Sequence, residues 1–260
     1  MLKIDLSGRK ALVTGGSRGI GAGIVRALAA AGAQVAFTHT GSERGSQAAG
    51  RLVEELSAAG GRLLALAVAA EDMGATEAAV VQVAETFGGL DIVIPNVGRN
   101  WDLRLDQLDL ENWEAGIQLN LTSAFIAVKT AYPWLQQAER GDIILIGSSG
   151  VTDGGGGSAF YASAKAGLVG MMHALMRELP CQGIHINTIH PCVVDTDLLR
   201  QRYETDKKRA TLAKEVPLGR LARPEDIGHL AAFLCSDLGS FICGQSILVD
   251  GGRTLWRQGR

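Results

Sequence analysis

The chain has 260 residues, 47% of them apolar, which is enough to bury one large core in a single domain. Its formal net charge is -2 with both signs mixed, so it offers no polybasic surface for nucleic acid, and no run approaches the ~18 uncharged apolar residues needed to cross a membrane. The N-terminus lacks a signal-peptide apolar region and the four cysteines form no C-x-x-C pair, so we predict a reduced, cytoplasmic protein without a metal site.

Short apolar runs alternate with longer helix-like segments, which is typical of a mostly parallel sheet covered on both faces. We predict strands at 10–14, 34–38, 63–68, 91–95, 142–148, 185–190 and 246–249. Helices are predicted at 19–31, 43–59, 74–87, 106–138 (interrupted), 159–179 and 225–235. No linker or repeat divides the chain, so we expect one α/β domain over residues 1–260, with a mobile, charged substrate flap around 197–215.

The first predicted strand leads into a glycine-rich turn that reads T-G-G-S-R-G-I-G over residues 14–21, and a helix follows it. Glycines at such a strand-to-helix turn let the backbone and the helix N-terminus approach a pyrophosphate closely. The turn therefore predicts a dinucleotide site, with contacts from Gly15, Ser17, Arg18, Gly19, Ile20 and Gly21.

The end of the second predicted strand indicates which dinucleotide is bound. NAD-binding folds place a carboxylate there for the ribose 2′-hydroxyl, but this chain has His39 and Thr40 instead. No acid repels a 2′-phosphate at this position, and Arg18 in the glycine loop can pair with one. The sequence favours NADP(H) over NAD(H); the alternative interpretations are that Arg18 is a solvated loop cation and His39 a surface histidine.

A hydroxyl, a phenol and an ammonium come together near residue 160. Tyr161 and Lys165 are four residues apart on a predicted helix and project from the same face, and Ser148 ends the strand before it. A phenol with a pKa near ~10 carries protons poorly at neutral pH, and a neighbouring ammonium favours its ionised form. The alternative is a packed helix tyrosine, and the pair Tyr203 and Lys207 shows that the four-residue spacing alone is weak.

These motifs resemble the short-chain dehydrogenase/reductase family, whose signature is Tyr-x-x-x-Lys with a Ser thirteen positions earlier, as in Ser148, Tyr161 and Lys165. The resemblance covers essentially the whole chain and is greatest to the 3-oxoacyl-carrier-protein reductases. It implies a single Rossmann-type, doubly wound domain with strand order 3-2-1-4-5-6-7. It also implies that Tyr161 is the general acid, that Ser148 binds the reacting oxygen, and that Lys165 lowers the phenol pKa and holds the nicotinamide ribose.

The same resemblance assigns roles to residues in three other turns. Asn96 and Gly98 follow the fourth strand in P-N-V-G and would contact the cofactor, while Asn120 would hold a water for proton relay. In the segment H-P-C-V-V-D-T after the sixth strand, the resemblance implies contacts to the nicotinamide carboxamide from Pro191, Val194 and Thr196. Cys192 replaces the family's glycine there, and an ordinary turn capped by Thr196 is the competing interpretation.

Two family features are altered or open to another explanation. The Asp that would hold the adenine is replaced by an Ala-Val-Ala-Ala run over 67–70, and Asp72 nearby is the candidate substitute. The turn around Asn96 and Gly98 could also be a simple strand-ending turn.

We therefore expect an NADP(H)-dependent oxidoreductase, with NAD(H) also possible, that reduces a 3-oxoacyl, polyketide-like or cyclic ketone. The alternatives are a dehydrogenase that oxidises a secondary alcohol, a catalytically silent NADP(H)-binding regulator, and an unrelated nucleotide-binding protein. The expected partner is a small carbonyl or alcohol substrate rather than nucleic acid or membrane, and the resemblance implies a homotetramer, a dimer of dimers. Because Gly154–Gly157 lacks side-chain bulk and Arg99, Asn100 and Trp101 could contact substrate, we expect a free ketone to be preferred over a carrier-bound chain.

Overall fold

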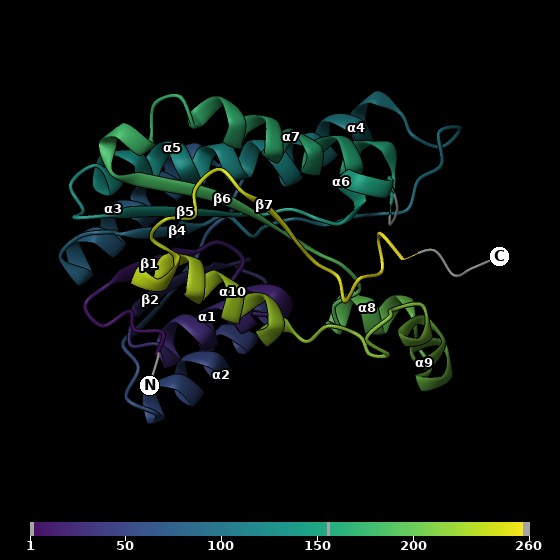
Figure 1. The fold of residues 1–260 in the computed structure, drawn as a ribbon, viewed down its shortest axis with the longest axis horizontal. Coiled ribbons are helices and arrows are strands. Elements are labelled where there is room, and N and C mark those ends of the chain that lie inside the picture. Colours follow the sequence, from purple (N-terminus) through teal and green to yellow (C-terminus); the bar gives the residue numbers. More distant parts are fainter. Residues whose placement is uncertain (1–2, 155–156, 257–260) are drawn as a thin grey trace.

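A seven-stranded parallel sheet forms the centre of the molecule (Figure 1). The computed structural model describes residues 3–154 and 157–256. The strand order is β3-β2-β1-β4-β5-β6-β7, as the resemblance implied. The strands are β1 Lys10–Val13, β2 Gln34–His39, β3 Leu63–Ala67, β4 Ile92–Ile94, β5 Gly141–Ile146, β6 Ile184–Pro191 and β7 Ser246–Val249.

Helices cover both faces of the sheet, as Figure 1 shows. On one face lie α1 Gly19–Ala30, α2 Glu43–Ala58 and α10 Pro224–Cys235. On the other lie α3 Met73–Phe87, α4 Leu110–Ile117, α5 Ser123–Leu135 and α7 Ala159–Leu175, with the short α6 Gly150–Asp153 beside α7. Two more helices, α8 Asp197–Arg202 and α9 Asp206–Lys214, project beyond one end of the sheet. Within the described residues, no helix is both long and apolar enough to cross a membrane.

Each face of the sheet has its own apolar core, which explains why the strands read as continuous apolar runs. The first core includes Phe37 of β2, Ile24 and Leu28 of α1, and Ile227 of α10. The second combines strands β4 to β6 with α3, α5 and α7, and its members include Val80, Ala127, Leu168 and Met172. Because both faces are buried, a one-residue slip of any central strand would expose neither face to water but would disrupt both cores.

A buried charge cluster lies at the end of the sheet where the strands begin, opposite the strand ends that carry the motifs. Asp142 at the start of β5 is fully buried and pairs with Arg9 (2.7 Å) and Arg140 (3.1 Å). Burial raises the pKa of the Asp142 carboxyl, and the two guanidinium groups oppose that effect. Removing one partner of such a pair typically costs about 3–5 kcal/mol, so the cluster locks β5 against the start of β1.

Each predicted strand and helix has a counterpart in the structure, and its ends lie within four residues of the predicted ones. Helix 106–138 begins later than predicted and contains a π-helical stretch, Gln118–Thr122, between α4 and α5. No helix was predicted in the expected flap at 197–215, but α8 and α9 form there. Both are short helices capped by threonine side chains, Thr196 and Thr205, and their apolar faces are too narrow to produce a helical period in the sequence.

Candidate active site

Ser148, Tyr161 and Lys165 come together where β5 ends and α7 runs past it. Tyr161 and Lys165 lie on one side of α7, with the Lys165 Nζ atom 5.9 Å from the centroid of the Tyr161 ring. The Ser148 hydroxyl hydrogen-bonds the Tyr161 phenol. Its oxygen also accepts the Gly150 N–H at 3.2 Å, which leaves the Ser148 proton directed away from the backbone. The three residues that the sequence grouped therefore form one constellation.

Lys165 is buried at the base of this constellation. Its ammonium donates to the backbone carbonyl of Ile146, the last residue of β5, at 2.9 Å. Burial lowers the pKa of Lys165 to about 8, because the enclosed site solvates the charge poorly. The side chain is therefore cationic at neutral pH but close to titration.

The pKa of Tyr161 lies above its ordinary value, because burial penalises the phenolate more than the Ser148 hydrogen bond stabilises it. The expectation that Lys165 lowers this pKa is wrong for this arrangement, since the ammonium bonds to Ile146 and not to the phenol. A raised pKa keeps the phenol protonated at neutral pH. That is the form in which Tyr161 can donate a proton.

Asn120 occupies the π-helical stretch between α4 and α5 and is buried. Its side chain accepts the Arg99 N–H at 2.9 Å and donates to the carbonyls of Arg99 (2.9 Å) and Gly116 (3.0 Å). A β-carbon on Gly98 would lie 2.7 Å from the Asn120 side chain and 2.9 Å from the Lys165 ammonium. Asn120, Gly98 and Lys165 are thus in contact range, and Asn120 fixes the backbone that follows β4.

The glycine loop between β1 and α1 is packed too tightly for side chains. Gly19 has a φ of +54°, which favours glycine, and a β-carbon on Gly21 would lie 2.2 Å from the Gly15 carbonyl oxygen. Asn96 donates to the carbonyls of Thr14 and Gly15, both at 3.1 Å, and so ties the end of β4 to this loop. The close backbone at the N-terminus of a twelve-residue helix fits a pyrophosphate, and Ser17 and Ile20 lie within the same turn.

The end of β2 also fits a 2′-phosphate. Arg18 is exposed at the N-terminal boundary of α1, and Thr40 is exposed at the end of β2, where its hydroxyl contacts Ser42 at 2.9 Å. His39 is buried, with its Nδ1 atom 2.8 Å from the Thr40 carbonyl, so the interpretation of His39 as a surface histidine is wrong. Arg44, in the first turn of α2, is a further cation near this position, and sequence reasoning missed it.

Arg44 forms an exposed ion pair with Asp197 at the start of α8, at 3.3 Å. This contact connects the region expected to hold the 2′-phosphate with the flap. The signal available in the sequence was its basic charge four residues after Thr40. The sequence could not predict the ion-pair partner of Arg44, because Asp197 is 153 positions away.

The turn after β6 lies next to the glycine loop. A β-carbon on Gly19 would lie 3.3 Å from the methyl group of Thr196. Pro191 and Val194 are buried, and Thr196 caps α8 by accepting the Leu199 N–H at 3.3 Å. The capped turn is therefore real, and it places Thr196 beside the predicted dinucleotide site.

Several residues expected near substrate or cofactor make packing and hydrogen-bond contacts within the protein. Trp101 stacks on Phe160 with ring centroids 4.4 Å apart, and Asn100 donates to Asp102 and accepts from Ser158. A β-carbon on Gly157 would lie 2.4 Å from the Asn100 side chain, so this glycine serves close packing rather than an open space. Gly155 and Gly156 lie outside the described residues. Asp72 caps α3 by accepting the Ala75 N–H at 2.9 Å, so its carboxylate is already engaged.

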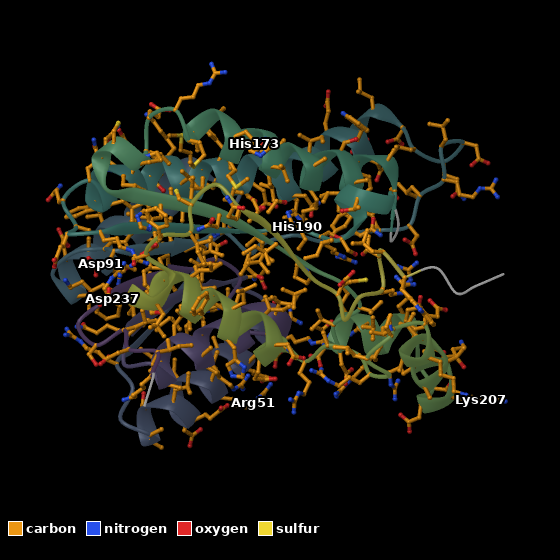
Figure 2. The ribbon with its side chains drawn as sticks, in the orientation of Figure 1. Arg51, Asp91, His173, His190, Lys207 and Asp237 are labelled. Carbon is orange, nitrogen blue, oxygen red and sulfur yellow. The ribbon has the colours of Figure 1, made fainter. Side chains whose placement is uncertain are left out.

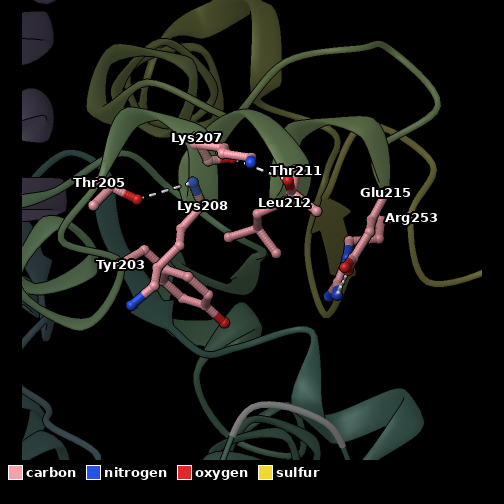
Figure 3. A pocket seen from close by; sticks show the side chains of 8 residues that line it. All are labelled: Tyr203, Thr205, Lys207, Lys208, Thr211, Leu212, Glu215 and Arg253. Carbon is pink, nitrogen blue, oxygen red and sulfur yellow. Dashed lines mark hydrogen bonds and ion pairs between the residues drawn. The ribbon is translucent and has the colours of Figure 1, made fainter.

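A cavity of about 510 Å³ lies between the flap and the C-terminal segment (Figure 3). In Figure 3 Arg253 and Glu215 face each other in an ion pair of 2.6 Å. The lining contains three cations, Lys207, Lys208 and Arg253, against one anion, Glu215, for a net charge of +2. We refer to this cavity as the flap pocket; its lining is completed by Thr205, Thr211 and Leu212.

No group of three or more His, Cys, Asp or Glu side chains in residues 3–154 and 157–256 could hold a metal ion. The residues that gather at the strand ends are instead donors for a phosphate-bearing cofactor and a proton-donating phenol. That set suits nicotinamide chemistry, in which the protein positions and protonates while the cofactor carries the redox step.

Comparison with known proteins supports this interpretation. A family model described as Enoyl-(Acyl carrier protein) reductase matches residues 15–254. The 3-oxoacyl-[acyl-carrier-protein] reductase FabG of Escherichia coli (strain K12) is 39% identical over 96% of this chain and 98% of its own. The L-rhamnose 1-dehydrogenase (NAD(P)(+)) of Azotobacter vinelandii is 34% identical over 97% of this chain and 98% of its own.

Among solved structures, a blue fluorescent protein from a metagenomic library in complex with NADPH superimposes with a TM-score of 0.87. It is 35% identical and covers 96% of this chain and 99% of its own. The fold and the strand order agree with these full-length matches. The chain therefore belongs to the short-chain dehydrogenase/reductase family and is a nicotinamide-dependent oxidoreductase.

Proposed function

We propose that this enzyme reduces a ketone to a secondary alcohol with NADPH, and that Tyr161 is the general acid. The observation that carries the proposal is the hydrogen bond between the Tyr161 phenol and Ser148, beside the Lys165 ammonium. The absence of a carboxylate at the end of β2 and the cations Arg18 and Arg44 nearby support NADPH over NADH. The NADPH complex of a relative 35% identical to this chain gives independent support.

In this proposal, the bound nicotinamide supplies the reducing equivalent to the carbonyl carbon. Ser148 donates a hydrogen bond to the carbonyl oxygen, and Tyr161 gives that oxygen its proton as negative charge develops. Lys165 provides a fixed positive charge below the phenol, and its contact range to Gly98 fits a role in holding the ribose. Asn120 holds the Arg99 backbone and so fixes the segment that follows β4 beside Lys165.

The same residues run the reverse reaction, with Tyr161 accepting the alcohol proton. The 34% identity to an L-rhamnose 1-dehydrogenase over nearly the full length favours oxidation of a polyol or sugar as the second candidate. The two directions differ in the form of Tyr161 that reacts. Reduction requires the protonated phenol, and oxidation requires the phenolate.

For the substrate, we propose a free ketone that carries an anionic group. The flap pocket has a net charge of +2, and the described ion pairs engage Arg253 but neither Lys207 nor Lys208. Arg140, the basic residue of the loop before β5, is engaged by Asp142 and by the carbonyls of Leu234 and Ser236, so that loop offers no free cation to an acidic carrier. Lys207 and Lys208 are therefore the cations that we propose for the anionic group of the substrate.

The test of the proposed function is consumption of NADPH with a panel of ketones, using Tyr161→Phe as the diagnostic variant. We expect turnover to fall by about 10²–10⁴-fold, the usual contribution of a general acid, while NADPH affinity stays within twofold, since little volume is lost. Tyr203→Phe is the matched control, because Tyr203 lines the flap pocket and should leave kcat intact. Normal turnover by Tyr161→Phe would refute the mechanism.

A further inference from the structure

His190 is a buried histidine of β6 that the mechanism above does not use. Figure 2 shows it inside the molecule, whereas His173 lies at the surface of α7. The imidazole is 1% exposed and touches three strands or strand ends. Its Nδ1 atom lies 3.2 Å from the backbone nitrogen of Ser148, and its Nε2 atom lies 2.7 Å from the Ser246 hydroxyl and 2.9 Å from the Thr188 hydroxyl.

The hydrogen-bond partners determine the tautomer. A backbone N–H can only donate, so Nδ1 must accept from Ser148 and carry no proton. The neutral ring then has its proton on Nε2, where the Ser246 and Thr188 oxygens accept it. Both nitrogens are satisfied in this form and in no other.

Gly147, the residue before Ser148, leaves space for the His190 ring because it has no side chain. A β-carbon on Gly147 would lie 2.3 Å from the His190 Nδ1 atom, so any side chain there would displace the imidazole. The flanking backbone bonds run from Gly147 N–H to Ile189 and from Ser149 N–H to Pro191. The Ser148 N–H between them has the His190 side chain as its acceptor, so the orientation of Ser148 depends on that ring.

We propose that His190 is a positioning residue whose neutral imidazole holds the Ser148 backbone, and through it the Ser148 hydroxyl, in place for proton transfer at Tyr161. This inference rests on the proposed function, because it concerns the same reaction. Protonation of Nδ1 would turn the acceptor into a donor facing the Ser148 N–H, and would add a positive charge near Lys165. Burial and the Lys165 ammonium both lower the pKa of His190, so this loss belongs to acid pH, below the ordinary value of 6.5.

The experiment measures ketone reduction across pH in three variants. His190→Phe keeps the ring volume without an acceptor, and we expect kcat to fall about tenfold with NADPH Kd unchanged, the effect of one buried hydrogen bond. His190→Asn places an amide oxygen where Nδ1 stood, so it should restore kcat to within about threefold of wild type and remove the loss of activity in acid. His173→Asn is the matched control for a surface histidine of α7 and should retain the wild-type pH profile.

The outcomes separate this inference from the proposed function. A wild-type enzyme with no ketone reduction refutes the proposed function, whereas wild-type turnover in His190→Phe, or an unchanged acid limb in His190→Asn, refutes only the role of His190. Neutron diffraction provides a test without activity: a proton on Nε2 supports the inference and a proton on Nδ1 overturns it. This measurement also decides the matter if His190→Phe fails to fold.

Discussion

Lys165 is a buried cation whose charge changes not far above neutral pH. Its ammonium donates to the Ile146 carbonyl but has little else to offset burial, so its pKa falls to about 8. The positive charge is present below this pH and is lost above it. The phenol of Tyr161 retains its proton over the same range because its pKa is raised.

We therefore expect the rate of ketone reduction to decline as pH rises through about 8, as Lys165 loses its charge. The measurement is the pH dependence of kcat/KM between pH 6 and 10 with saturating NADPH. A profile that stays flat to pH 10 would mean that Lys165 remains charged throughout and that the surroundings stabilise its ammonium more than burial destabilises it.

A second prediction at this scale concerns Arg18 and the choice of cofactor. Arg18→Ala should weaken NADPH binding by about tenfold, within the range for one charge-assisted hydrogen bond, and should spare NADH, which lacks the 2′-phosphate. Fluorescence titration with both cofactors measures the difference. Arg51→Ala, on the exposed side of α2, is a suitable control. Equal losses for NADPH and NADH would indicate a general defect of the glycine loop.

At the scale of elements, the flap differs from the rest of the fold. Helices α8 and α9 are held by threonine caps and by exposed ion pairs such as Arg44 with Asp197, which typically contribute about 0–1 kcal/mol each. Only Leu212 of the two helices is buried. Such weak anchoring suits a segment that moves over substrate.

The flap pocket predicts a charge preference among substrates. The double variant Lys207→Ala/Lys208→Ala should lower kcat/KM about tenfold for a ketone with a distal carboxylate, and leave an uncharged analogue nearly unchanged. Lys214→Ala, on the same helix but outside the lining, is the matched control. Equal loss for both ketones would refute an anion site, and a strong preference of the wild type for a carrier-bound thioester would refute the free-ketone proposal.

At the scale of the whole molecule, large apolar side chains remain at the surface. Leu110 of α4 and Phe125 of α5 are exposed, and Phe241, before β7, is fully so. They lie on different parts of the chain, which is what two distinct contacts in a dimer of dimers would require. The sequence resemblance also implies a tetramer.

We accordingly predict a homotetramer at micromolar concentration. Light scattering should give four times the 27.3 kDa mass of one chain. Phe241→Glu should weaken the assembly if this residue lies in a contact, and Leu105→Glu, also exposed, provides a comparison. A monomeric wild type would contradict the prediction.

Much of the molecule could be predicted from local patterns in the chain. The strand order and the place of Ser148 followed from the family resemblance. The pairing of Tyr161 and Lys165 followed from helical spacing, which depends only on neighbouring residues. The glycine turn could also be predicted, because close packing and positive φ both require glycine. The helices of the flap were missed, since their short amphipathic faces produce no clear period.

Other features were decided only when distant segments packed together. The direction of the Tyr161 pKa shift, the bond from Lys165 to Ile146, and the pairing of Arg44 with Asp197 all depend on residues far away in sequence. His190 contacts Ser148, which is 42 positions away in the sequence, and nothing in either residue type predicts this hydrogen bond. Desolvation and hydrogen-bond geometry are properties of the packed interior, so tertiary structure alone determines which groups are charged and which backbone each side chain holds.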